Sequence, residues 1–388
     1  MLLPFSFVNM LSEPSYLPAR MVAAKIEAHF ALHLDAAKKA GGRELAYAPS
    51  TPVIEAIIDI AFWASLRREE GHPPKISLAF LPPEQAGKPL IFQNSLRLTP
   101  QYLTKLAPAV EQPGIHLGVW YGDDGLYVWG TTHNIPGICF VLEVIEPGLL
   151  VIKHRRTDGF GKFVNIAVLR GDDIKVIDEQ NTSLENCPAL LQSVMEMPLP
   201  SALGGSFNIL VELATVMRAH NRGGLVLIVP TDSHTWHKSI IHPISYPVSP
   251  PYSAIPNLIK DISNRKSLEW KQAMRNAIDI IGGFTAVDGA TIINRDNELL
   301  AFGAKIARSE LSIPVDQMIM TEPIIDGTPV YMHPAQNGGT RHLAAAQFVY
   351  DQRDAQAMVA SVDGHFTLFA WSHRMNMVHA HRIDVLLM

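Results

Sequence analysis

The sequence has few cysteines and no excess of basic residues, and each shortage excludes a class of protein. Only two of its 388 residues are cysteine, Cys139 and Cys187, which excludes the disulfide framework of a small secreted domain. The formal net charge of −5 provides no basic stripe for nonspecific nucleic-acid binding. We therefore expect a protein of a reducing, cytoplasmic compartment that has no nucleic-acid partner.

Long apolar runs are also missing. No run reaches the roughly 18 residues that a membrane-spanning helix requires, so no membrane partner is expected. The longest candidate, Val53–Leu66, contains Glu55 and Asp59, and its apolar residues share one helical face, which predicts a helix that faces a core. The N-terminal stretch lacks a basic start and is broken by Pro4 and Pro14, so we interpret it as a docking segment rather than a signal peptide.

The first part of the chain has the pattern of a folded α/β domain. Hydrophobic residues make up 47% of the sequence and charged residues 18%, as is typical of globular proteins. Apolar stretches alternate with good turn residues, which predicts an antiparallel meander. Its strands are expected at Leu117–Tyr121, Leu126–Trp129, Ile138–Ile145, Leu149–His154, Phe163–Leu169 and Ile174–Ile177. A helix over Asn208–Arg218 and a buried strand over Leu225–Val229 would complete a domain of residues 1–245.

A dense run of prolines between residues 243 and 256 predicts a linker or an extended strap, because proline restricts its neighbours and lacks a backbone donor. We place the domain boundary there, so the second domain spans residues 246–388. It should be a mixed β-sheet flanked by helices. Its expected elements are a helix from the N-cap Ser267 to Gly282-Gly283, strands Phe284–Val287, Thr291–Asn294 and Leu299–Ile306, a long loop over 307–339, a helix over Arg341–Tyr350, and a hairpin of Ala355–Ser361 with His365–Trp371.

One segment of the second domain has the features of a phosphate site. Gly338 and Gly339 leave backbone N–H groups open, and Thr340 is expected at a helix N-cap. Arg341 and His342 follow in the first helical turn, where the backbone dipoles favour an anion. This combination predicts a ligand that carries phosphate.

A second segment, Asp288-Gly289-Ala290, supplies an acid. Asp288 ends an apolar run and is followed by two residues too small to block the close approach of a ligand. A carboxylate in that position can hold a divalent metal ion or take a proton from a hydroxyl group. A phosphate site and a metal-holding acid together are what nucleotidyl transfer needs.

The two segments resemble the diadenylate cyclase family, which is marked by Asp-Gly-Ala and by Gly-Thr-Arg-His-Arg. The resemblance runs from about residue 250 to about residue 371 and includes Phe302–Ile306 and Val359–Gly364. It implies an enzyme that condenses two ATP into cyclic di-AMP and pyrophosphate, needs Mg²⁺ or Mn²⁺, and works as a homodimer with two cyclase domains face to face. It also implies an N-terminal sensor domain, as in multi-domain relatives.

The resemblance assigns roles to residues by position. Asp288 would hold the metal and activate the ribose 3′-hydroxyl. The nucleotide would be bound by Gly289, Ala290, Gly339, Thr340, Arg341, His342 and Ser361. Two alternatives stay open from the residues alone: His342 as a structural histidine that its helix buries, and Ser361 as a cap at a strand end.

The chain also departs from the family pattern. Leu343 stands where the family has its second Arg, and Val362 stands where many members carry an acidic or amide residue. The motifs lie 340 − 288 = 52 positions apart, which indicates an inserted loop. Lys305 or Arg308 could replace the charge missing at Leu343. These departures leave two other hypotheses: a protein of the same fold that binds ATP or cyclic di-AMP without turnover, and a plain α/β scaffold that binds no nucleotide.

Overall fold

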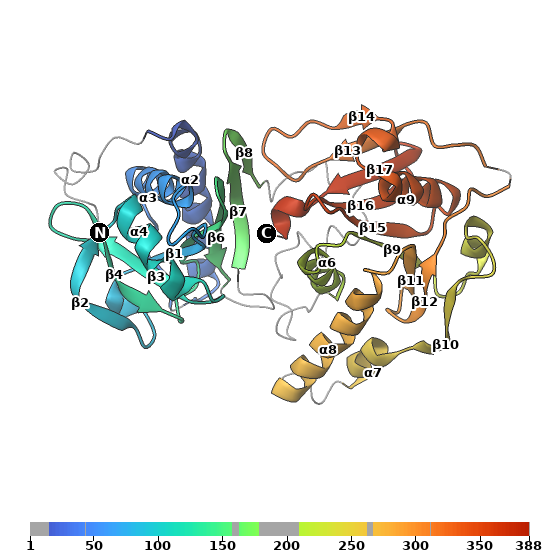
Figure 1. Ribbon diagram of the computed structural model, residues 1–388, viewed down its shortest axis with the longest axis horizontal. Coiled ribbons are helices and arrows are strands. Elements are labelled where there is room, and N and C mark those ends of the chain that lie inside the picture. Colours follow the sequence, from blue (N-terminus) through green and yellow to red (C-terminus); the bar gives the residue numbers. More distant parts are fainter. Residues whose placement is uncertain are drawn as a thin grey trace. The chain divides into compact units, whose positions relative to one another are not determined.

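The computed structural model describes residues 15–42, 44–156, 163–177, 209–261, 267–310 and 312–387. The chain divides into two compact units, one containing the described residues up to Ile177 and the other those of 209–387 (Figure 1). Each unit has a mixed β-sheet with helices against it, which confirms the predicted α/β class. None of the described helices is both long enough and apolar enough to cross a bilayer. The expected docking segment lies largely outside the described residues.

The first unit contains a sheet of eight strands in the order β2-β4-β3-β1-β5-β6-β7-β8. These strands are β1 (Ile76–Phe80), β2 (Leu90–Arg97), β3 (His116–Tyr121), β4 (Leu126–Thr132), β5 (Phe140–Glu146), β6 (Leu149–Arg155), β7 (Phe163–Arg170) and β8 (Asp173–Val176). All six strands predicted between residues 117 and 177 are confirmed. The continuous meander is not, because β1 lies between β3 and β5 and runs parallel to β3.

One face of this sheet packs against helices. They are α2 (Leu17–Lys39), α3 (Thr51–Ser65) and α4 (Pro100–Leu106), with the short 3-10 helix η2 (Ala107–Val110). A further 3-10 helix, η1 (Pro83–Gln85), follows β1 in the chain. The core between helices and sheet includes Phe30, Ile57 and Phe140, all at most 1% exposed. The predicted core-facing helix is therefore confirmed as α3. A smaller cluster around Trp129 and Cys139 covers the other face.

The second unit contains a sheet of nine strands in the order β10-β12-β11-β9-β15-β16-β17-β13-β14. They are β9 (Gly224–Val229), β10 (Tyr246–Tyr252), β11 (Ala290–Asn294), β12 (Leu299–Ala304), β13 (Met318–Thr321), β14 (Val330–Met332), β15 (Gln356–Ala360), β16 (Phe366–Ser372) and β17 (Met377–Arg382). Its helices are α6 (Ile209–Ala219), α7 (Ala254–Lys260), α8 (Leu268–Phe284) and α9 (Thr340–Asp351), with η4 (Thr235–Ser239), η6 (Pro334–Gln336) and η7 (Asp384–Leu386).

Helices cover both faces of the second sheet. Side chains alternate along its buried strands, so one strand contributes to the core on each face. On β9, Leu225 and Leu227 join a core with α9 that includes Phe348. Val226 points the other way, into a core with α6, α7 and α8 that includes Met274. The starting point of α9 is thereby fixed against the sheet that carries the Asp-Gly-Ala segment.

Two expectations about the boundary region are wrong. The strand over Leu225–Val229 was assigned to the N-terminal section, but β9 lies in the middle of the second sheet between β11 and β15. The proline-rich stretch was expected to be a linker or an extended strap at the domain boundary. Tyr246–Tyr252 is extended, but it forms β10, which pairs with β12 at the edge of the second sheet instead of joining two domains. An edge strand needs only half of its backbone donors, so proline is tolerated there.

The predicted course of the chain before the Asp-Gly-Ala segment is also wrong. Ser267 is the N-cap of α8 as predicted, and its hydroxyl accepts a hydrogen bond of 3.0 Å from the Trp270 N–H. The helix then continues through Gly282-Gly283 to Phe284, so there is no strand over Phe284–Val287. Gly282 is needed for packing, because an added Cβ would lie 2.3 Å from Val216 Cγ1 of α6.

The long loop expected over 307–339 carries two short strands. β13 runs parallel to β17, and β14 pairs with β13 at the edge of the sheet. The inserted length thus extends the sheet, and η6 then leads into α9, whose predicted range is confirmed to within a residue at each end. The predicted hairpin of β15 and β16 is confirmed as well.

Candidate functional site

The register of the second sheet brings the two sequence motifs to one place. β9 and β11 are parallel, with Thr291 opposite Val226, so both strands begin at the same end of the sheet. β15 runs antiparallel to β9, with Ala360 opposite Gly224, so β15 ends where the other two begin. The turn before β11, the loop before β9 and Ser361 after β15 therefore meet at one sheet end.

Asp288 and Gly289 lie in the turn from α8 to β11. Asp288 is exposed, whereas Ala290 is 1% exposed and begins the strand. Gly289 has φ +101°, and an added Cβ would lie 2.6 Å from the carbonyl carbon of Gly303. Only glycine permits this backbone contact at this φ. The contact holds the Asp288 carboxylate at the sheet end while leaving it open to solvent.

The start of α9 differs from the expectation by one residue. Gly339 is the N-cap and makes no side-chain cap, so Thr340 occupies the first helical position instead. The N–H of His342 donates to the Gly339 carbonyl at 3.0 Å. Within the described chain, the N–H groups of Gly339, Thr340 and Arg341 have no hydrogen-bond acceptor. They are the donors that a helix N-terminus offers to an anion.

The Arg341 side chain leads from α9 to the same sheet end. A Cβ added to Gly223 would lie 3.0 Å from Arg341 Nη1 and 3.3 Å from the carbonyl oxygen of Ala360. The guanidinium group therefore lies beside the start of β9 and the end of β15. The structure thus brings Arg341 to the strand ends that also carry Asp288 and Ser361. Gly223 was not predicted as part of the site.

Ser361 begins the turn between β15 and β16. Its N–H donates to the His365 carbonyl at 2.9 Å, and its own carbonyl accepts from the Gly364 N–H at 3.2 Å. Its Oγ is buried and has no hydrogen-bond partner among the described residues. The hydroxyl therefore caps nothing in the described chain. A buried hydroxyl without a partner is costly, and a ligand at this position would satisfy it.

His342 is buried, and its geometry favours the structural alternative. The residue is 3% exposed, its Nε2 lies 3.5 Å from Thr367 Oγ1, and its ring packs edge-on against Phe369. Burial, with smaller contributions from Arg382, His365 and Arg341, lowers its pKa to about 4. The imidazole is therefore neutral at pH 7 and supports the glycine turn, because an added Cβ at Gly338 would lie 2.4 Å from its Nδ1.

Two further residues hold the turn that precedes α9, and sequence reasoning missed both. Arg382, the last residue of β17, donates from Nη2 to Asn337 Oδ1 at 2.9 Å. Its Nη1 lies 3.3 Å from Glu322 Oε1, and both side chains of this ion pair are largely buried. Asn337 directly precedes the glycine pair, so this network fixes the turn in place. The contacts span distant parts of the chain, and no local pattern indicates them.

The residues that depart from the family pattern lie on the surface. Leu343 is 38% exposed and Val362 is 57% exposed, so neither is a core residue. Lys305 is exposed and follows β12, whose end lies beside the start of β11 because Ala304 pairs with Ala290. Lys305 is therefore at the same sheet end as Asp288.

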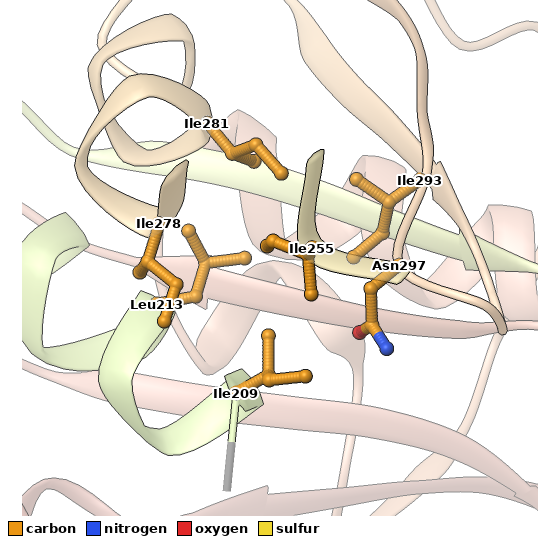
Figure 2. A pocket seen from close by; sticks show the side chains of 7 residues that line it. All are labelled: Ile209, Leu213, Ile255, Ile278, Ile281, Ile293 and Asn297. Atoms are coloured by element: carbon orange, nitrogen blue, oxygen red, sulfur yellow. The ribbon is translucent and has the colours of Figure 1, made fainter. Parts of the chain in front are cut away.

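An apolar hollow in the second unit is a separate feature. It lies among α6, α7, α8 and β11. Figure 2 shows the side chains of Ile209, Leu213, Ile255 and Ile278 converging on it, with Asn297 as the one polar residue among those that line it. The residues that line this hollow include no charged group, so it offers nothing to a phosphate.

Part of the first unit is similar to a known protein family. Residues 43–133 match the family described as "Probable sensor domain DACNV". The matched region lies in the first unit and runs from just before α3 to the end of β4. No curated protein matches the chain. The protein is therefore of the α/β class, with a region similar to a sensor domain in its first unit and with Asp288, Arg341 and Ser361 at one end of the sheet in its second.

Proposed function

We propose that the second unit is a diadenylate cyclase domain that converts two ATP into cyclic di-AMP and two pyrophosphates, and that the first unit regulates it. The observation that carries this proposal is the convergence of Asp288, Arg341 and Ser361 on one end of the sheet. Residues 43–133, which match a sensor domain, support the regulatory role of the first unit.

The reaction requires little covalent chemistry from the protein. The 3′-hydroxyl of one ATP attacks the α-phosphorus of the other, a new O–P bond forms, and the bond to pyrophosphate breaks. A second attack in the opposite direction closes the ring. Asp288, exposed at the strand end, accepts the proton of the attacking hydroxyl.

The phosphates of each ATP lie at the start of α9. The open N–H groups of Gly339, Thr340 and Arg341 donate to phosphate oxygens, and the helix dipole favours their charge. The Arg341 guanidinium adds a planar pair of donors. Ser361 Oγ, which has no partner in the described chain, donates to the nucleotide.

A divalent ion fits this donor set. Mg²⁺ is bound in proteins by one or two carboxylates together with substrate phosphates, and Asp288 is an exposed carboxylate at the sheet end to which Arg341 also points. When bound, Mg²⁺ or Mn²⁺ neutralises charge on the triphosphate. Asp288 is the protein ligand that we assign to it.

Ring closure requires two sites. One cyclase domain holds one ATP, and both 3′-hydroxyls must face the α-phosphorus of the opposite nucleotide. We therefore propose a homodimer in which two cyclase domains meet face to face, with the end of the sheet at Asp288 and Arg341 directed at the partner copy.

A second candidate function is binding of ATP or cyclic di-AMP without turnover. The exposed Leu343, one residue past His342, favours it, because an apolar side chain stands where the family supplies a cation. Loss of one electrostatic contact to a developing charge can raise a barrier by about 3–4 kcal/mol. A protein with such a loss would still bind the nucleotide through Arg341 and the helix N-terminus.

One experiment separates these functions. The purified full-length chain is incubated with ATP and Mn²⁺, and the products are resolved by chromatography, with Asp288→Asn as the control. Cyclic di-AMP from the wild type alone supports the cyclase. ATP binding by calorimetry without product supports the binding protein. If the wild type neither forms cyclic di-AMP nor binds ATP, the proposal of a nucleotide site is wrong.

A further inference from the structure

Three histidines gather in the first unit, well away in sequence from the motifs of the second. His29 and His33 are one turn apart on α2, and His154 is on β6. Their ring centroids are separated by 4.1 Å for His29 and His33, 5.5 Å for His29 and His154, and 5.2 Å for His33 and His154. One ring nitrogen from each lies within 4.8 Å of the others, and the described residues contain no other such group.

The cluster lies between α2 and the sheet. His154 is 1% exposed and His33 is 7% exposed, while His29 is half-buried. On β6, His154 shares a face with Leu150 and Ile152, which belong to the core beneath the helices. The buried His33 and His154 therefore lie next to the main core of the unit, and the half-buried His29 gives the cluster access to solvent.

The hydrogen bonding of His154 fixes which of its nitrogens can bind a ligand. Its Nδ1 lies 3.0 Å from the Arg155 carbonyl oxygen, which can only accept a hydrogen bond. Nδ1 therefore carries the proton, and the lone pair of the neutral ring is on Nε2. This arrangement, with one ring nitrogen donating to a backbone carbonyl, is the one that accompanies metal-binding histidines.

The chemistry of three imidazoles selects the ion. Neutral imidazole suits zinc, copper, nickel and cobalt, whereas magnesium and calcium require oxygen ligands. Three ligands on a tetrahedral ion, each at about 2.0–2.1 Å, lie roughly 3.3 Å from one another. The observed limit of 4.8 Å would close to that value by small side-chain rotations on α2.

We propose that His29, His33 and His154 bind one divalent transition-metal ion of the zinc class and supply three of its ligands. The ion joins α2 to β6, so its binding tightens the contact between helix and sheet. Metal occupancy is then an input that the first unit senses. The inference rests on the first unit alone and holds whether or not the second unit turns over ATP.

The test measures Zn²⁺ binding to the full-length chain after treatment with a chelator, by competition against a chromophoric zinc indicator. Wild type should take up one Zn²⁺ with an affinity at least tenfold above that of His29→Gln and of His33→Gln. His133→Gln, at an exposed position of the same unit, is the matched control and should bind as the wild type does. A triple His234→Gln, His237→Gln, His242→Gln variant excludes the other histidine-rich segment and should also retain binding.

Two further readouts guard against a variant that fails to fold. Co²⁺ bound to the wild type should give the visible absorption of a tetrahedral site. This absorption should be absent in His29→Gln. Because His29 is only half-buried, the His29→Gln variant should fold, and loss of the signal then reports loss of a ligand. Zn²⁺ should raise the Tm of the wild type and not that of His33→Gln. Equal Zn²⁺ affinity in wild type and both α2 variants, or no uptake by the wild type, would overturn the proposal and leave the histidines as packed core residues.

Discussion

Asp288 is the residue on which the proposed chemistry depends most. Asp288→Asn keeps the size of the side chain but removes its charge, so we expect turnover of ATP to cyclic di-AMP to be abolished. The exposed position of Asp288 means that the fold should be unaffected, which circular dichroism can check. Turnover within about tenfold of the wild type would show that the carboxylate has another role.

Arg341 should contribute to binding through its contact with phosphate. Arg341→Ala removes a charge-assisted hydrogen bond, so ATP affinity measured by calorimetry should fall by about 1.5–3 kcal/mol. Arg353→Ala is a suitable control, because Arg353 lies past the other end of α9 and its guanidinium group lies 4.1 Å from the centre of the Trp371 ring. If Arg341→Ala binds ATP as tightly as this control, the phosphate site lies elsewhere.

Leu343 tests whether the departure from the family pattern limits the enzyme. Leu343 is 38% exposed on the first turn of α9, so Leu343→Arg should be tolerated by the fold. The new guanidinium group should raise kcat more than it raises ATP affinity, if it acts on charge that develops in the transition state. A wild type that is already fast, with no gain in Leu343→Arg, would indicate that Lys305 supplies the missing cation.

The contact between α6 and α8 supports the turn that carries Asp288. An added Cβ at Gly282 would lie 2.3 Å from Val216 Cγ1, so Gly282→Ala should force the helices apart and destabilise the second unit by about 1–3 kcal/mol. Gly283 is the matched control, because an added Cβ there meets nothing within 4 Å. Gly283→Ala should stabilise by about 0.4–1 kcal/mol, since alanine restricts the unfolded chain.

Denaturant titration of both variants checks this prediction through the shift in unfolding midpoint. Equal effects of the two substitutions would mean that helix propensity, rather than packing between α6 and α8, decides the outcome.

Gly282 also shows which features local sequence patterns do not predict. The N-cap at Ser267 and the alternation in residues 117–177 are local patterns, and the structure confirms them. The Gly282-Gly283 pair predicted a helix end. In the structure, Gly282 instead allows α8 to pack closely against Val216 of α6, which is distant in sequence. The proline-rich segment was interpreted as a linker or an extended strap. Its place in the sheet was not predicted, because pairing with β12 depends on residues distant in sequence.

The residues of the candidate site also fall into those that a local motif predicts and those that only the fold brings together. Asp288, Thr340 and Arg341 were found because each stands in a short motif of a particular chemistry. Gly223 and Arg382 were missed because their roles arise only when strands that are far apart in the sequence become neighbours. The third member of the histidine cluster, His154, was missed for the same reason, although the spacing of His29 and His33 on one helical face is visible in the sequence.

At the scale of the whole molecule, the two sources of the proposed function lie in different units. The region matched to a sensor domain lies within the first unit, and the motifs for a nucleotide lie within the second. The chain was expected to divide near residue 245, but β9 and α6 belong to the second sheet and its cover. A fragment intended to contain the nucleotide site must therefore include residues from 209 onward, since β9 is the strand between β11 and β15.

The stability of the molecule in acid should depend on buried histidines of the second unit. Burial is the main cause that lowers the pKa of His342 and of His379 to about 4 each, against an ordinary value of 6.5. Between these values the unfolded chain binds more protons than the folded one, so the free energy of unfolding falls as pH decreases. The stability is fully present above about pH 6.5, and each group removes on the order of 3 kcal/mol by pH 4.

Urea unfolding followed by tryptophan fluorescence should therefore show a lower midpoint at pH 5 than at pH 7.5. His342→Gln should reduce this difference, because the side chain that must take up a proton on unfolding has been removed. His373→Gln, at an exposed position, should keep the wild-type difference. An unchanged midpoint in the wild type would show that His342 and His379 gain protons without unfolding, and that the turn before α9 tolerates a charged imidazole.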